Sequence, residues 1–256
     1  MNLKVFVRSV LLALIGCVSL RATVIANAQI SLTSLQIVPT TGTFTLVSPW
    51  MATAFAQGQN SLGELDQVFD GPGLTANATA MVTDVTASGS ADASLLTAGA
   101  SSMIDISGMG LMTASSTGQS SLTSTFMITG GTGSVNVQFT ANVTRTIALA
   151  TDAFGQFAEE ELISSLLLDG NQVLFSHDLA SIGPNDSFSM MISSAQSQME
   201  TLQFNTVYTL GYYSDDDTYP NMNGMIPEPA TIWLIGVPLG LSIAGRRLRI
   251  FHRYFK

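Results

Sequence analysis

Between residues 29 and 225 this chain holds few side chains that could do catalytic chemistry. The segment has one histidine, His177, which precedes Asp178, and it has no cysteine. A zinc site needs several converging histidine, cysteine or carboxylate ligands, and a Ser-His-Asp triad would depend on His177 alone. No serine lies in a Gly-x-Ser-x-Gly motif. The sequence therefore predicts a protein that is not an enzyme, with His177 in a solvated loop at the end of a strand.

Aspartate clusters are the main candidates for metal ligands, because hard oxygen ligands suit calcium, which is abundant outside cells. One pair is Asp66 with Asp70, and a second group includes Asn221 or Asn223. The aspartates of that second group are Asp215, Asp216 and Asp217. Neither spacing matches a calcium-loop motif, so the alternative is a solvated acidic segment. No cofactor other than this calcium is expected.

A carbohydrate-binding surface would use exposed aromatic rings, which stack on sugar rings. The aromatic candidates are Trp50, Tyr208, Tyr212 and Tyr213. Tryptophan and tyrosine are also ordinary core residues. The paired carboxylates of a glycosidase cannot be chosen from a sequence, because their separation is a three-dimensional quantity. Asp84, Asp92 and Asp105 are expected at solvent-facing strand positions.

The charge of the central segment excludes one class of partner. Only Arg145 of the 9 lysines and arginines lies between residues 29 and 225, whereas all but one of the 18 acidic residues lie there, which leaves a net charge near −16. A surface this acidic repels phosphate backbones and anionic lipids, so no nucleic acid is expected as a partner. Because Cys17 is the only cysteine, no disulfide can stabilise the segment, and its stability must come from a hydrophobic core.

Alternating apolar and polar residues predict that β-strands build this core. In the run 134–149 the residues alternate from Val135 to Val143, with Asn136 to Asn142 on the opposite face. Together with residues 121–129 and the glycine-rich turn 130–133, this run is expected to form a hairpin. A second hairpin is expected around Asp169-Gly170-Asn171.

Further strands are expected at residues 188–192, 200–204 and 207–213. Residues 159–161 are three glutamates that could instead begin a helix, although a strand is favoured. The stretch 75–133 is rich in Ala, Ser, Thr and Gly, which is typical either of disorder or of strands; its low charge and regular apolar residues favour strands. About ten short strands at this spacing predict one antiparallel β-sandwich.

The C-terminal thirty residues have the pattern of a sorting signal. Pro227, Glu228 and Pro229 precede an uncharged run, Ala230–Gly245. As a helix this run would reach roughly 24 Å, just short of the ~30 Å hydrocarbon core of a bilayer. The cations behind it are expected to stop transfer and stay cytoplasmic; they are Arg246, Arg247, Arg249, Arg253 and Lys256. The alternative is a buried C-terminal helix of a globular domain.

This three-part tail resembles the PEP-CTERM signal of Gram-negative bacterial surface proteins. The resemblance implies that an exosortase, an integral-membrane protease, recognises Pro227, Glu228 and Pro229 and removes the tail. Residues 230–245 would hold the precursor transiently in the inner membrane. The resemblance also implies a jelly-roll-like ectodomain that ends in a late Tyr-rich strand, which would be Val207–Tyr213 here.

The N-terminus is expected to be a secretory signal peptide. Lys4 and Arg8 precede an apolar stretch, and Ala26-Asn27-Ala28 offers a cleavage site before Gln29. Leu14-Ile15-Gly16-Cys17 fits a lipobox, so a cut that makes a lipidated Cys17 the new N-terminus is the alternative. The expected organisation is a signal peptide (1–28), a β-sandwich ectodomain (29–213), an acidic linker (214–226) and a PEP-CTERM sorting signal (227–256).

Together these features predict an exported protein without catalytic activity. It would be delivered as a membrane-anchored precursor to the cell surface or to an extracellular matrix of exopolysaccharide. Its expected partners are the exosortase, the inner membrane and this exopolysaccharide. The alternative function is an extracellular module that binds carbohydrate or calcium.

Overall fold

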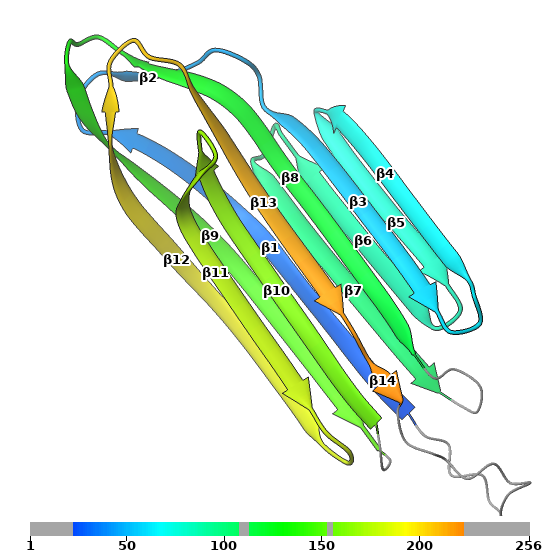
Figure 1. Cartoon of the computed structure of the whole chain (residues 1–256). Coiled ribbons are helices and arrows are strands. Elements are labelled where there is room, and N and C mark those ends of the chain that lie inside the picture. The colour runs from blue at the N-terminus through cyan, green and yellow to red at the C-terminus, as the bar shows by residue number, and fades with distance from the viewer. Residues whose placement is uncertain (1–22, 108–112, 153–155, 223–256) are drawn as a thin grey trace, which may run out of the picture. The chain divides into compact units, whose positions relative to one another are not determined.

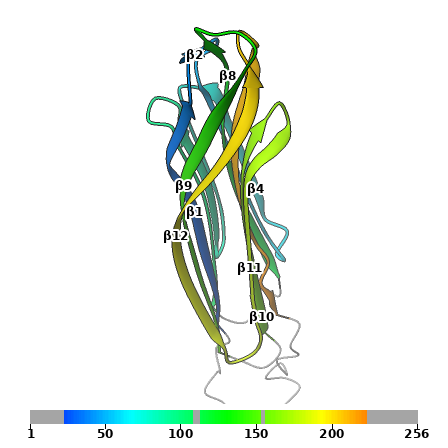
Figure 2. The same cartoon turned by 90° about the vertical axis from the view of Figure 1, so that its left-hand side faces the viewer.

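A computed structural model describes residues 23–107, 113–152 and 156–222, and the regular elements in those ranges are β-strands (Figure 1). The strands form two antiparallel sheets that lie face to face (Figure 2). The predicted all-β, antiparallel sandwich is therefore confirmed. No helix within these ranges is long and apolar enough to cross a membrane.

The first sheet, called sheet 1, contains six antiparallel strands. In order across the sheet they are β12 (Ser187–Gln203), β9 (Ser134–Thr151), β1 (Thr23–Pro39), β7 (Thr97–Ser107), β6 (Val85–Asp92) and β5 (Thr75–Val82). Strand β1 lies near the middle and pairs with β9 on one side and β7 on the other.

The second sheet, called sheet 2, contains eight strands. Its main order is β11 (Asn171–Ile182), β10 (Gln156–Leu168), β13 (Tyr208–Thr218), β8 (Ala114–Thr129), β3 (Met51–Asn60) and β4 (Leu65–Gly73). Two short strands extend it, β2 (Thr43–Leu46) beside β8 and β14 (Asn221–Met222) beside β10. All the pairings are antiparallel.

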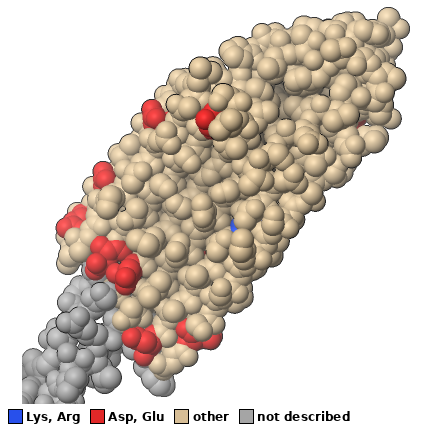
Figure 3. Space-filling view, turned by 180° about the vertical axis from the view of Figure 1, so that it is seen from behind, with Lys and Arg blue, Asp and Glu red and all other residues tan. Residues whose placement is uncertain are grey.

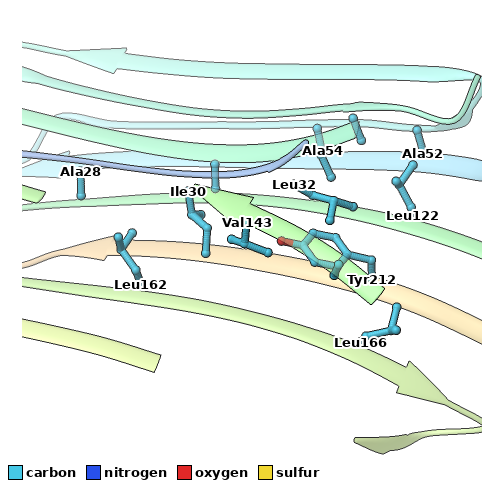
Figure 4. Packing of buried hydrophobic residues seen from close by; sticks show 14 of the residues in the cluster. Ala28, Ile30, Leu32, Ala52, Ala54, Leu122, Val143, Leu162, Leu166 and Tyr212 are labelled. Carbon is cyan, nitrogen blue, oxygen red and sulfur yellow. The ribbon is translucent and has the colours of Figure 1, made fainter. Parts of the chain in front are cut away.

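Alternate residues of the strands point between the two sheets and form the core. In β9 the residues from Val135 to Val143 that were expected inside are buried, and those between them, from Asn136 to Asn142, are exposed or half-buried. Figure 4 shows buried side chains of both sheets in this space, among them Ile30, Leu32, Val143, Leu162, Leu166 and Tyr212. At one end of the sandwich the ring of Phe126 lies 5.1 Å from Phe44 and 5.8 Å from Tyr208.

Small residues bring the two sheets unusually close over part of their area. A Cβ atom on Gly89 of β6 would lie 1.9 Å from the carbonyl oxygen of Gln119 in β8. A Cβ atom on Gly118 would lie 2.4 Å from the carbonyl oxygen of Ser88. Backbone therefore touches backbone here, closer than the ~10 Å at which sheets usually pack. This contact requires small residues at these positions of the stretch 75–133, most of which forms strands β5 to β8 in the described residues.

One of the two expected hairpins is wrong. Strand β8 lies in sheet 2 and β9 lies in sheet 1, so the glycine-rich turn between them crosses from one sheet to the other. Gly130 and Gly133 have positive φ angles of 89° and 76°, and a Cβ on Gly131 would lie 2.5 Å from the ring of Phe204. Alternation predicted both strands, but it carries no information on which partner each strand takes.

The other hairpin is confirmed. Strands β10 and β11 pair through the turn at Asp169 and Gly170, whose φ angles are 49° and 80°. Two consecutive residues with positive φ are typical of a tight hairpin turn. The strand favoured at residues 159–161 is also present, as part of β10.

The boundaries of the sandwich differ from the expected 29–213. Strand β1 begins at Thr23, and Ala26 and Ala28 are fully buried in it. Strand β13 continues to Thr218, so the first residues of the expected linker, from Ser214, are a core strand. The reason is alternation, because every second residue of Tyr208–Thr218 from Leu210 onward is buried. Residues 1–22 and 223–256, which include most of the expected signal peptide and the expected sorting signal, lie outside the described residues.

Candidate functional site

The three aspartates considered as calcium ligands do not converge. They occupy successive positions of β13, so Asp216 points into the sandwich while Asp215 and Asp217 point out of sheet 2. In the part of the chain that the structure describes, no three His, Cys, Asp or Glu side chains are grouped in a way that could hold a metal ion. The three aspartates therefore do not form the candidate calcium site, and the favoured assignment of these residues to a solvated linker is wrong.

Asp216 belongs instead to a buried group that we call the carboxyl–hydroxyl cluster, formed by Glu160, Asp216, Ser102 and Thr218. The Ser102 hydroxyl donates to Asp216 Oδ1 at 2.5 Å and also contacts the Thr218 hydroxyl. The Thr218 hydroxyl donates to both carboxyl oxygens of Glu160 at 2.7 Å. Strands β7, β10 and β13 supply these four residues, so the cluster ties the two sheets together.

Burial changes the protonation of both acids in the cluster. It is the largest cause that raises the pKa of Glu160 to about 10, and the nearby charge of Asp216 raises it further. Burial also raises the pKa of Asp216 to about 7, against the hydrogen bond from Ser102. A low dielectric disfavours the charged form of a carboxyl group. Glu160 is therefore a neutral acid at pH 7.

The cluster is not placed for catalysis. Glu160 and Asp216 have no exposed surface, so a substrate could reach them only if the sheets separated. Within the described chain, Asp216 Oδ2 has no hydrogen-bond partner, which makes the cluster costly to charge. The chemistry that this arrangement supports is proton binding linked to stability.

The outward face of the same strands holds an acidic and aromatic strip. The Tyr213 hydroxyl donates to Asp215 Oδ2 at 2.9 Å. Burial and the charge of Asp217 raise the pKa of Asp215 to about 6. Burial and the same neighbour raise the pKa of Tyr219 to about 12. Asp215 and Asp217 are half-buried at these outward positions.

His177 was expected in a loop, but it lies in the middle of β11. Its side chain lies on the outer face, where Nε2 is 2.9 Å from Glu161 Oε1. Asp178, the next residue, points inward, and its Oδ2 accepts a hydrogen bond of 2.5 Å from Arg145 Nη1. Since His177 and Asp178 lie on opposite faces of one sheet, they cannot act together in a triad.

Arg145 is a buried cation for which the sequence predicted no role. It lies on β9 in sheet 1 and bridges to Asp178 of sheet 2, and its Nη2 donates to Ser194 Oγ at 3.0 Å. The alternation of the strand could have revealed this buried position, because Arg145 is the next inward-facing residue after the series that runs from Val135 to Val143. Glu160 could have been found in the same way, since it shares its parity with Leu162 and Leu166 in β10.

The second calcium pair, Asp66 with Asp70, has a structural role. Asp66 accepts a hydrogen bond of 2.8 Å from the backbone N–H of Met81, and Asp70 accepts one of 2.7 Å from that of Asn77. Glu64 accepts another from the N–H of Thr83 at 3.0 Å. Hydrogen bonds from Asn60 and Thr83 lower the pKa of Glu64. Asp66 and Asp70 thus occupy two outward N–H groups of β5, the edge strand of sheet 1, and Glu64 occupies that of the residue after it, which hinders further strand pairing.

The aromatic candidates for sugar stacking are mostly in the core. Trp50 and Tyr212 are buried. Tyr208 packs against Phe126, and its hydroxyl accepts a hydrogen bond of 2.7 Å from the backbone N–H of Gln203. Of the four, Tyr213 alone points out of a sheet, and it is half-buried beside Asp215. An exposed aromatic platform formed by these residues is therefore excluded.

The outer face of sheet 1 is broad and nearly uncharged. Figure 3 shows the molecule from this side: most of the acidic residues lie near the margins, and one acidic patch lies within the face. Across the six strands the outward residues are mainly Ser, Thr, Asn and Gln, which can both donate and accept hydrogen bonds. One row across the sheet is Ser193, Thr144, Ser31, Gly99, Ser90 and Asn77.

The comparisons with known proteins add no relative to this description. No protein-family model, no curated protein and no solved structure matches the chain.

Proposed function

We propose that the chain is an exported protein without catalytic activity, delivered to the cell surface or to a polysaccharide matrix. Its C-terminal tail would be recognised at Pro227, Glu228 and Pro229 and cut by an exosortase. The support is the PEP-CTERM-like tail in the sequence, joined to a β-sandwich that has its own core. The resemblance further suggests a jelly-roll-like ectodomain, and the frequent crossings between the two sheets are compatible with it.

The position of the two ends of the sandwich is the observation that most favours this proposal. The backbone N–H of Thr23, at the start of β1, donates to Asp152 Oδ1 at 2.6 Å. Met222, at the end of β14, pairs with Gln156. Asp152 and Gln156 are only four positions apart in the chain, so both ends leave from the same end of the sandwich, as Figure 1 also shows.

This geometry suits a body displayed from a membrane. A strand of 18 residues such as β9 spans about 60 Å at ~3.4 Å per residue. The opposite end of the sandwich holds β2 and the glycine-rich turn. Only one end of the fold needs to face the exosortase.

The same proposal constrains the N-terminal cut. Cleavage after Ala28 would remove Thr23–Ala28 from β1, where these residues pair with β7 and, from Val24 onward, with β9. It would also uncover the core around Val24 and Ala26. A mature N-terminus before Thr23 keeps β1 whole, and the lipobox cut at Cys17 satisfies this condition. We therefore favour Cys17, with a lipid anchor, over the Ala-x-Ala cut.

Fractionation tests the sorting proposal. The native chain and a variant with Pro227, Glu228 and Pro229 replaced by alanine are expressed in a host with and without its exosortase. The expected result is a shortened native protein at the surface or in the medium, and an uncut variant in the membrane. Asn223→Ala is the matched control and should be processed normally. An uncut variant that still reaches the medium would contradict the proposal.

A further inference from the structure

A hollow of about 400 Å³ interrupts the outer face of sheet 1. The hollow lies across the neighbouring strands β1, β7, β6 and β5, with residues of all four strands around it. The polar side chains around it include Ser31, Thr75, Asn77, Ser90, Asp92 and Thr97. Ligand sites in proteins commonly have volumes of about 300–1,000 Å³, so the hollow is large enough for a short segment of a larger molecule.

The hollow exists because one row of the sheet lacks a side chain. Gly99 of β7 stands between Ser31 of β1 and Ser90 of β6. Asn77 of β5 follows Ser90 in the same row. The pairing of β1 with β9 is also irregular between Leu32 and Ser34, which shifts the strand beside the hollow. A bulge of this kind bends a strand locally.

Hydrogen-bonding side chains around the hollow are free to bind a ligand. Some outward side chains elsewhere on this face bond to each other across strands, as Ser88 does with Ser101 at 2.7 Å and Asn142 does with Ser34 at 2.6 Å. Further pairs of this kind are Gln138–Ser197, Thr140–Ser197 and Thr144–Ser193. Among the described residues, the side chains of Ser31, Ser90, Thr97 and Asn77 have no such partner.

The charges near the hollow select the class of ligand. Arg145 is the only lysine or arginine in the described ranges, and it is buried and paired with Asp178. An anion such as phosphate or sulfate would therefore find no cation here. Asp92 offers a carboxylate whose Oδ1 already accepts hydrogen bonds from Ser94 and Leu95, and the Ser94 hydroxyl is the main cause that lowers its pKa. The ligand should be neutral and rich in both donors and acceptors.

We propose that this hollow is a binding site for a neutral glycan, held by hydrogen bonds from Ser31, Asn77, Ser90 and Thr97 without aromatic stacking. A sugar hydroxyl both donates and accepts, as these side chains do. The site deepens the proposed function, since it gives the displayed protein a contact with neutral matrix polysaccharide. This proposal rests on the proposed function, because the protein must reach the matrix to meet the glycan. Glycan binding itself can be tested independently of sorting.

The test uses the full-length chain in mild detergent on an array of neutral, uronic-acid and sulfated oligosaccharides. The expected result is retention on neutral oligosaccharides. Ser90→Trp fills the hollow from an exposed strand position and should abolish retention. Ser189→Trp places the same ring at an exposed, outward position of β12 and should leave it unchanged. Asn77→Ala removes a side chain that lacks a protein partner and should weaken binding about tenfold, with an unchanged unfolding midpoint.

Three results would overturn the proposal: no retention on any neutral oligosaccharide, retention that Ser90→Trp leaves intact, or retention only on sulfated or uronic-acid oligosaccharides. The sorting proposal fails separately. If the chain binds neutral glycan but is never cut at its tail, the binding site is supported and the sorting proposal is contradicted.

Discussion

At the level of single residues, the main feature is a core in which ionisable side chains are buried beside hydrogen-bonding or oppositely charged partners. Glu160 and Asp216 share Ser102 and Thr218 between them, and Arg145 meets Asp178 across the two sheets. Burying such groups costs free energy unless each has a partner. In return, they fix the register of one sheet against the other, because hydrogen bonds have stricter geometry than apolar contacts.

Stability should fall as pH rises, because of Glu160. Its pKa is raised from 4.5 to about 10 in the folded protein, so between these values the folded state binds a proton that the unfolded state has lost. This contribution is complete below about pH 4.5 and is lost as pH approaches 10. We expect a Tm lower by about 5–10 °C at pH 9 than at pH 5.

Circular dichroism melts of Glu160→Gln and of Glu159→Gln check this prediction. Glutamine keeps the shape of the neutral acid and cannot ionise, so Glu160→Gln should flatten the decline. Glu159, its half-buried neighbour on the outer face, is the matched control and should retain it. Equal slopes for the native protein and Glu160→Gln would contradict the assignment.

Removal of Arg145 should be strongly destabilising. Arg145→Met leaves Asp178 as a partly buried carboxylate without its cation. Loss of one partner of a fully buried pair typically costs about 3–5 kcal/mol in the free energy of unfolding, and the 21% exposure of Asp178 should keep the cost near or below the lower end of that range. The double variant Arg145→Met, Asp178→Leu removes both charges and should recover most of that loss. Urea unfolding of the three proteins measures it. If the double variant is no more stable than the single one, the pair does not act as described.

At the scale of elements, the fold depends on how closely the sheets approach at Gly89 and Gly118. Both glycines lie in strands rather than turns, and each touches the backbone of the opposite sheet. A side chain at either site would force the sheets apart. The small residues in this half of the sandwich therefore have a packing role, which their composition alone did not reveal.

Gly89→Ala should lower the free energy of unfolding by about 3 kcal/mol or more, because overpacking against backbone cannot be relieved by a rotamer change. Gly211→Ala is the matched control. It is also a strand glycine, and its nearest atoms would lie at 3.9 Å from the new Cβ, so its effect should be small. Urea unfolding of both variants measures the difference. A Gly89→Ala protein as stable as Gly211→Ala would refute the close approach.

The sequence predicted strands better than it predicted their partners. Alternation from Val135 to Val143 identified a strand and its buried face, and Asp169-Gly170 identified a hairpin turn. The turn at Gly130–Gly133 could not reveal that it crosses between sheets, since that depends on distant strands β1 and β12. Residues Asp215–Asp217 were expected in a solvated linker because of their charge. The alternation of buried and exposed positions continues through them, however, and all three belong to β13.

At the scale of the whole molecule, both ends of the described body leave from one end of the sandwich. Under the proposed delivery to the cell surface, the nearly uncharged face of sheet 1 would be the surface that meets matrix polysaccharide. The acidic residues beside β5 block edge pairing on one side. Display, sorting and glycan contact are thus compatible on one body.

Intact-mass spectrometry of the protein recovered from its native source reports both processing sites at once. The expected mass is that of a chain that has lost its tail beyond Pro227-Glu228-Pro229 and that begins before Thr23, with a lipid on Cys17. A mature protein that still ends at Lys256 would contradict exosortase processing. A mature protein that begins at Gln29 would contradict the requirement that β1 remain whole.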